Sequence, residues 1–155
     1  MKNRYDAYCG LYCGACEILL INELNRIEEK AKEWNMKVDD AICYGCKSSQ
    51  NAIYCRNCYF KKCAEAKKVG FCSQCNDYPC MQLREFKNDK FPHHSVVLKS
   101  LEAIKEKGYK QWLVDQEIRW KCKICGSRFA WYKDFCDNCG EELYNCVKEE
   151  MTLTD

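Results

Sequence analysis

The stretch that decides the fold is CKICGSRFAWYKDFCDNCG, residues 122–140, in which Cys122 and Cys125 are repeated as Cys136 and Cys139. Two cysteines separated by two residues in a tight turn can coordinate one metal ion, and four such sulfurs complete a tetrahedral site. A glycine follows the second cysteine of each pair and permits the backbone turn. These residues therefore predict a closed four-thiolate site, with zinc as the favoured ion.

The segment between the two pairs indicates how the site is built. Residues 127–133 carry Phe129, Trp131 and Tyr132, a composition that suits a short hairpin. We therefore expect a zinc ribbon at this end of the chain. Rubredoxin-type iron is the chemical alternative, because iron also accepts four thiolates. A closed site of this kind is structural by default.

The composition extends the metal argument to the whole chain. Cysteine occupies 16 of 155 positions, far above its usual share in globular proteins. The first residues lack the apolar run of a signal peptide, and no stretch approaches the roughly 18 apolar residues of a membrane span. We therefore expect a cytoplasmic protein without a membrane partner. Thiols stay reduced in that compartment, which favours metal sites over disulfides.

The net charge of the chain helps to decide which class of partner it binds. The formal net charge of +2 counts every cysteine as neutral. A zinc ion with four thiolates carries a net charge of about −2, so several such sites would turn the loaded protein acidic. Nucleic acid is therefore an unlikely partner. We expect the partner to be a protein.

A first cysteine cluster has the spacing Cys9-x3-Cys13-x2-Cys16 and runs into an amphipathic pattern that predicts one helix over residues 17–34. Radical S-adenosylmethionine enzymes use the same spacing to leave one iron of a four-iron cluster open, but they need a large barrel that the remaining sequence does not encode. Two alternatives stay open. A fourth cysteine could complete a four-iron cluster, or a distant cysteine could complete a zinc site.

A second cysteine-rich region, residues 43–80, holds eight cysteines and an internal repeat, since Cys-x2-Cys-x4-Cys occurs at residues 55–63 and again at residues 72–80. Spacing does not choose among the possible partitions. The division that we favour places Cys43, Cys46, Cys55 and Cys58 in one site and Cys63, Cys72, Cys75 and Cys80 in another.

The odd number of cysteines before the ribbon raises three other candidate metal ligands. Eleven cysteines precede the ribbon. With this number, one site has only three cysteine ligands, two sites share a ligand, or Cys146 or a histidine completes a site. His93 and His94 follow a proline and precede a predicted helix, so we expect local hydrogen bonds rather than metal ligation or catalysis. We interpret Cys146 as a spare thiol.

Further helices are predicted from periodicity and capping residues. They cover residues 64–69 with a stop at Gly70, residues 81–86 opened by Pro79, residues 96–107 capped by Ser95, and residues 109–119. The tail after Cys146 is expected to be frayed.

Three motifs resemble a known family. They are YCGLYCGAC at residues 8–16, CYGC at residues 43–46 and FCSQCNDYPC at residues 71–80. On these motifs the chain resembles the cysteine-rich prokaryotic domain-of-unknown-function family 3795, and the likeness continues through residues 91–95 and Trp112 toward the ribbon. The resemblance implies a small cytoplasmic metal-binding protein and carries over no catalytic residue.

The patterns together predict a small metal-stabilised α+β fold, with short helices, cysteine-knuckle metal sites and a C-terminal zinc ribbon. We expect a cysteine-rich metal-binding domain over residues 1–90, a helical linker over residues 91–120, and the zinc ribbon with its tail over residues 121–155. Metal would stabilise the fold, because a modest core barely offsets chain entropy at this size.

Three functions fit this expectation. The leading hypothesis is a zinc-binding module for protein interaction, an adaptor. The second is an iron–sulfur protein with an electron-transfer or cluster-dependent role through Cys9, Cys13 and Cys16. The third is a nucleic-acid-binding ribbon, which would require a steep loss of binding with salt. No nucleophile–base pair, phosphate loop or carboxylate pair argues for an enzyme.

Overall fold

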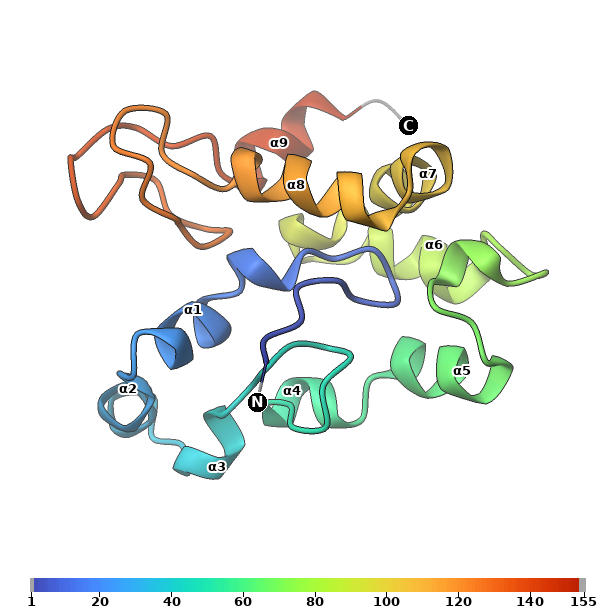
Figure 1. Cartoon of the computed structure of the whole chain (residues 1–155), viewed down its shortest axis with the longest axis horizontal. Coiled ribbons are helices and arrows are strands. Elements are labelled where there is room, and N and C mark those ends of the chain that lie inside the picture. The colour runs from blue at the N-terminus through green and yellow to red at the C-terminus, as the bar shows by residue number, and fades with distance from the viewer. Residues whose placement is uncertain (1, 154–155) are drawn as a thin grey trace.

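A computed structural model describes residues 2–153 as a set of short helices joined by loops (Figure 1). The α-helices are α1 (Glu17–Glu23), α2 (Ile27–Glu33), α3 (Val38–Ala41), α4 (Ile53–Arg56), α5 (Tyr59–Lys67), α6 (Met81–Lys87), α7 (Val97–Lys107), α8 (Tyr109–Arg119) and α9 (Cys146–Thr152). Three 3-10 turns, η1 (Cys13–Ala15), η2 (Cys72–Gln74) and η3 (Pro92–His94), complete the elements. Helices α7, α8 and α9 lie on one side, and α1 to α5 lie on the other (Figure 1).

The predicted α+β class is wrong. Across residues 2–153 no strand forms, and extended pairing is limited to isolated bridges. The bridges join Asp6 with Tyr12, Lys121 with Arg128, and Phe135 with Glu142. The hairpin expected over residues 127–133 does not form. After one bridge the chain enters the next cysteine turn, so too few residues remain to extend a ladder.

The single helix expected over residues 17–34 is two helices. Asn25, which follows α1, has φ of 55° and Asn35, which follows α2, has φ of 53°. Asparagine is among the few non-glycine residues that enter this left-handed region, so each one ends a helix and turns the chain. The apolar periodicity correctly indicated helical structure in this segment. It continues across Asn25, where the chain turns and separates α1 from α2.

Other helix boundaries also differ from the predictions. Helix α5 begins five residues before the predicted start and ends at Lys67, because Lys68, with φ of 57°, stops the helix two residues before Gly70. Ser95 does not cap α7, because its hydroxyl donates to the Pro92 carbonyl at 2.7 Å. Helix α6 begins at Met81, with Cys80 rather than Pro79 directly before it. Helix α8 has the predicted bounds. The tail forms α9 instead of fraying.

One main core joins distant parts of the chain. Val97, Leu101 and Trp112, which lie in the segment expected to be a linker, are almost completely buried. The same cluster of buried residues includes Cys9 near one end and Cys136 near the other. A smaller cluster around Ile21, Ile27, Ala31 and Ala41 holds α1, α2 and α3 together. The division into three segments at residues 90 and 120 stays a prediction.

The C-terminal lobe, residues 121–145, is anchored to the N-terminal segment. The Arg128 guanidinium forms an ion pair with Glu23 at 2.6 Å and donates to the Gly14 carbonyl at 2.8 Å. The Trp131 amide donates to the Ala15 carbonyl at 3.0 Å. These contacts place the lobe beside η1, close to the first cysteine cluster.

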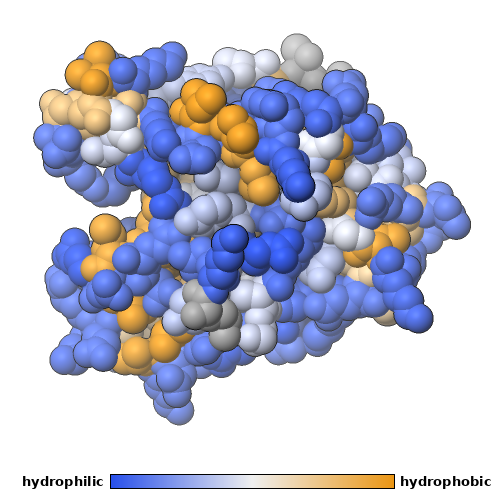
Figure 2. Space-filling model, viewed as in Figure 1, coloured by the Kyte–Doolittle hydropathy of each residue, from blue (hydrophilic) through white to orange (hydrophobic). Residues whose placement is uncertain are grey.

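The outer surface carries scattered apolar side chains. Figure 2 shows apolar residues exposed over α8 and on the C-terminal lobe, and these include Val114, Ile118, Ile124 and Phe135. None of the helices described within residues 2–153 has both the length and the apolar character needed to cross a membrane.

Candidate metal centre

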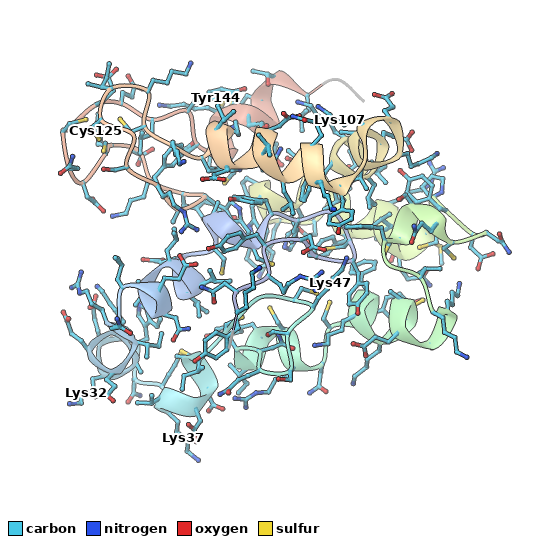
Figure 3. The ribbon with its side chains drawn as sticks, in the orientation of Figure 1. Lys32, Lys37, Lys47, Lys107, Cys125 and Tyr144 are labelled. Atoms are coloured by element: carbon cyan, nitrogen blue, oxygen red, sulfur yellow. The ribbon has the colours of Figure 1, made fainter. Side chains whose placement is uncertain are left out.

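The C-terminal lobe brings four sulfurs together. The Sγ atoms of Cys122, Cys125, Cys136 and Cys139 all lie within 4.8 Å of one another. Cys122 Sγ lies 3.6 Å from Cys139 Sγ, and Cys125 Sγ lies 3.5 Å from Cys136 Sγ. Four sulfurs bound tetrahedrally at about 2.3 Å from one ion lie about 3.8 Å apart. The group therefore has the size of a site for a single metal ion (Figure 3).

Two copies of one turn build this site. The Cys122 amide donates to the Ser127 carbonyl at 2.8 Å, and the Cys136 amide donates to the Glu141 carbonyl at 2.8 Å. In both copies the glycine after the second cysteine lies in the left-handed region, with φ of 76° at position 126 and 78° at position 140. Because only glycine enters that region without strain, the glycines fix the turn that aims each sulfur pair inward.

The pKa values of Cys125 and Cys139 are shifted in opposite directions. Hydrogen bonds with the Ser127 hydroxyl and the Asn138 side chain lower the pKa of Cys125 to about 5. The Glu141 amide lowers the pKa of Cys139, but partial burial and hydrogen bonds with the neighbouring thiols raise it to about 12. Cys125 is therefore a thiolate at neutral pH before any metal arrives, whereas an incoming cation has to displace the proton of Cys139.

A second group of cysteines lines a cavity. Cys63, Cys72, Cys75 and Cys80 face a cavity of about 300 Å³ between α5 and α6. These are the four cysteines that the sequence analysis assigned to one site. Burial, followed by the charges of Cys80 and Cys63, raises the pKa of Cys72 to about 12. The Cys72 thiol is thus held in the neutral form without a metal, and a positively charged centre would favour its ionisation.

Polar contacts around this cavity favour sulfur in its charged form. The Lys67 ammonium lies 3.2 Å from Cys75 Sγ and 2.8 Å from the Asp77 carboxylate. The Asp77 amide points at Cys75 Sγ at 3.4 Å. The same backbone turn recurs at Cys43, whose sulfur accepts from the Gly45 amide at 3.4 Å. Such donors stabilise thiolates and tune the metal that they bind.

The remaining seven N-terminal cysteines lie close to one another. They are Cys9, Cys13, Cys16, Cys43, Cys46, Cys55 and Cys58. Burial raises the pKa of Cys9 well above its ordinary value, and the charges of Cys46 and Cys58 raise it further. Burial also raises the pKa of Cys55 to about 12, with added effects from Cys16 and Cys43. The first cluster and residues 43–58 therefore interleave in space, and which four sulfurs share a metal stays a prediction.

The two halves of the chain differ in sulfur spacing. Among residues 2–153, the C-terminal four are the one group of three or more cysteine, histidine or acidic residues whose ligand atoms all lie within 4.8 Å. No three of the eleven sulfurs from Cys9 to Cys80 meet that limit. The N-terminal sulfurs affect one another's pKa, but no three of them lie together as closely as the C-terminal four.

The two histidines and the sixteenth cysteine lie elsewhere. The His93 ring stacks on Trp131 with centroids 4.1 Å apart, and its Nδ1 lies 2.6 Å from the Tyr132 hydroxyl. His94 bonds to the Asp89 carboxylate at 2.7 Å. Neither histidine joins a group of ligand atoms among the described residues. Cys146 is buried and lines one cavity together with His93 and Trp131.

Sequence reasoning missed the charged residues that support the N-terminal cysteines. Asp6 is buried between Lys47 at 2.8 Å and Arg4 at 3.2 Å, and Lys47 also lies over the Phe71 ring at 3.5 Å. No local pattern marks the pair of Asp6 and Lys47, because the two residues lie 41 positions apart. A signal did exist at Lys47, which directly follows a candidate ligand, Cys46.

This arrangement defines a cysteine-rich helical protein with a four-thiolate group that could hold a metal ion. The chain belongs to the family described as Protein of unknown function (DUF3795), whose sequence model matches residues 5–85. The match includes all eleven N-terminal cysteines and ends before the C-terminal lobe. No curated protein and no solved structure matches the chain.

Proposed function

We propose that this chain is an iron–sulfur protein that transfers electrons, and that one zinc ion holds its C-terminal lobe. The observation that carries the proposal is the difference in sulfur spacing. The C-terminal sulfurs fit around one ion, whereas the N-terminal sulfurs stand further apart. Thiolates that bind an iron–sulfur cluster lie further apart than zinc ligands, because iron and sulfide atoms stand between them. The second sequence hypothesis is therefore preferred here over closed zinc sites throughout.

The cavity between α5 and α6 is the best-supported cluster site. Its four cysteines surround a space of about 300 Å³, which exceeds what one zinc ion fills. Sulfur is the ligand that iron–sulfur clusters require, and four cysteines is their usual number. The Lys67 ammonium and the Asp77 amide would donate to the Cys75 thiolate, and such hydrogen bonds raise the reduction potential of a cluster.

Electron transfer suits this site better than enclosed chemistry. Cys63, Cys72, Cys75 and Cys80 are all partly exposed, so a cluster there would lie near the surface and within reach of a redox partner. A protein is the partner that fits the exposed apolar residues on the lobe and on α8, such as Ile118, Ile124 and Phe135. We assign no substrate and no catalytic residue.

The test is a reductive titration of the full chain purified without oxygen. A brown protein should lose its visible absorption when dithionite is added, give an electron paramagnetic resonance signal, and recover both on reoxidation. Cys75→Ser should remove or shift part of the signal, because it removes a cluster ligand. Cys146→Ser is the control, since this cysteine joins no group of metal-ligating sulfurs among the described residues and lies beside His93 and Trp131 instead.

A colourless protein that binds only zinc would overturn the proposal. So would a signal that Cys146→Ser and Cys75→Ser change equally, because that outcome would separate the colour from the assigned cavity.

A further inference from the structure

The four cysteines of the C-terminal lobe differ in their access to solvent. They lie in two turns, the first cysteine turn (residues 122–125) and the second cysteine turn (residues 136–139). Cys125, labelled in Figure 3, and Cys139 are exposed, whereas Cys122 and Cys136 are buried. Each turn therefore contributes one buried and one exposed cysteine, and a small reactant in solution reaches the exposed one first.

Each exposed sulfur has a buried sulfur of the other turn as a close neighbour. Cys139 Sγ lies 3.6 Å from Cys122 Sγ, and Cys125 Sγ lies 3.5 Å from Cys136 Sγ. The sulfurs of a disulfide lie about 2.05 Å apart, so either pair needs a movement of roughly 1.5 Å to form one. Cysteines that sense oxidants have this arrangement, in which an accessible sulfur stands beside a second cysteine that resolves its oxidised form.

We propose that the four C-terminal cysteines form a site of oxidative modification, which hydroperoxides attack at Cys125 and Cys139. Cys136 resolves the oxidised product at Cys125, and Cys122 resolves the product at Cys139. This reactivity goes beyond the electron transfer proposed above. It rests on the proposed function only for the zinc ion that the modification releases.

The chemistry of each pair of sulfurs balances with one hydroperoxide. The Cys125 thiolate attacks the terminal oxygen of the hydroperoxide, so an S–O bond forms and the O–O bond breaks. The leaving oxygen takes a proton and departs as an alcohol, or as water when the reactant is hydrogen peroxide. The Cys136 thiolate then attacks the sulfenic acid at Cys125, so an S–S bond forms, the S–O bond breaks, and the hydroxide takes a proton and leaves as water. The sulfur pair loses two electrons and the hydroperoxide gains them.

Oxidation of both pairs removes all four ligands of the proposed zinc ion, because zinc binds thiolates and not disulfides. The loop between the two turns carries the contacts with the N-terminal segment. Its Trp131 amide donates to the Ala15 carbonyl at 3.0 Å, and its Arg128 guanidinium donates to the Gly14 carbonyl at 2.8 Å. We therefore expect oxidation to release zinc and to loosen these contacts beside the first cysteine cluster.

The test is a titration of the full chain, purified without oxygen, with hydrogen peroxide. Released zinc is measured by elemental analysis, free thiols are alkylated in denaturant, and tryptic peptides are identified by mass spectrometry. Trypsin cleaves after Lys123 and Arg128, so the two cysteines of the first turn fall in separate peptides, residues 122–123 and 124–128. The two cysteines of the second turn share the peptide of residues 134–148 with Cys146. The peptides therefore separate pairing between the turns from pairing within a turn.

The expected product is one species in which residues 122–123 and residues 124–128 are both linked to residues 134–148, formed with loss of about one zinc per chain. Cys146 is an internal control on the same peptide and should be alkylated, because it is buried and joins no group of sulfurs among the described residues. Cys136→Ser should increase dimedone labelling of Cys125 several-fold, because no sulfur resolves the sulfenic acid. Cys146→Ser is the control variant and should leave this labelling as in wild type.

Two results would overturn the inference. Residues 122–123 linked directly to residues 124–128 would show that the cysteines pair within their turns. Four free C-terminal thiols and retained zinc, while Cys146 or the N-terminal cysteines are oxidised, would remove the site. Absence of zinc before peroxide is added contradicts the proposed function instead. The disulfide pattern still decides the inference in that case, because the four sulfurs lie together in the structure without a metal.

Discussion

The sulfur atoms of Cys122 and Cys139 lie 3.6 Å apart, although 17 residues separate them in the sequence. This separation is close to that of two thiolates on one zinc ion, so the loop between them is shaped for metal binding. Residues of that loop in turn contact Glu23 and Ala15. We therefore expect metal in the C-terminal lobe to stabilise the contact with the N-terminal cysteine region.

Loss of one C-terminal ligand should affect the lobe first. Cys136→Ser should remove one equivalent of zinc and expose the amides of residues 121–145 to hydrogen exchange, because the metal would hold the two cysteine turns together. The Trp131 amide, which bonds to Ala15 at 3.0 Å, is the most informative probe. Cys146→Ser is the control and should leave the zinc content unchanged. Full zinc content in Cys136→Ser would contradict the four-thiolate site.

Two glycines with similar backbone angles should tolerate alanine very differently. Gly45 has φ of 102°, and a Cβ there would lie 1.7 Å from the Arg4 carbonyl oxygen. Gly140 has φ of 78°, and a Cβ there would meet nothing within 4 Å. Gly140→Ala should cost about 1 kcal/mol of conformational strain. Gly45→Ala should prevent folding of the Cys43–Cys46 turn and lower the iron content. Equal thermal stability of the two variants would contradict this packing.

Asp6→Asn should destabilise the chain strongly. The Asp6 carboxylate is buried between Lys47 and Arg4, and its loss leaves the buried Lys47 ammonium unpaired, which costs about 3 kcal/mol or more. Glu29→Gln, which breaks an exposed pair with Arg26, is the matched control and should change stability little. Urea unfolding at neutral pH measures both.

The same pair has a predicted pH signature. Burial alone would raise the pKa of Asp6, but hydrogen bonds and charges from Arg4 and Lys47 outweigh it, so the pKa lies below 3.8. Stability from this carboxylate is therefore present above pH 3.8 and is lost as pH falls through the lowered pKa. The difference in unfolding free energy between wild type and Asp6→Asn should shrink in that acidic range. A constant difference would contradict the ionised pair.

His93 should make the unfolding free energy depend on pH in a higher pH range than Asp6 does. Burial, with a smaller effect from His94, lowers its pKa to about 3. Because the unfolded chain binds the proton near pH 6.5, the unfolding free energy should fall as pH drops below about 6.5. His93→Phe keeps a ring against Trp131 and should flatten this slope, whatever its effect at pH 7. An unchanged slope would show that His93 is not buried as a neutral ring.

The sequence predicted single features well and their combination less well. The bounds of α8 and the grouping of the four C-terminal cysteines followed from spacing, because short-range turns place those sulfurs together. The α+β class failed because a ribbon-like cysteine pattern specifies turns and not strand length. The helix predicted over residues 17–34 failed because Asn25 adopts a left-handed conformation that apolar periodicity does not report.

The rest depended on contacts between distant residues. Trp112 is an ordinary helix residue in sequence, and its nearly complete burial becomes apparent only when distant segments pack into the main core around it. The wider spacing of the N-terminal sulfurs also has no local signature, because Cys-x2-Cys steps serve zinc and iron–sulfur sites alike. Zinc and iron–sulfur sites differ in how far apart the folded segments place the sulfurs, which the local sequence does not report.

The most direct test of the account is the iron, zinc and acid-labile sulfide content of the full chain purified without oxygen. We predict about one zinc per chain together with iron and sulfide in equal amounts, and a broad absorption band near roughly 400 nm. Cys136→Ser should lower the zinc alone, and Cys75→Ser should lower the iron and sulfide. Several zinc ions per chain with no iron, no sulfide and no visible band would contradict the assignment of the N-terminal cysteines.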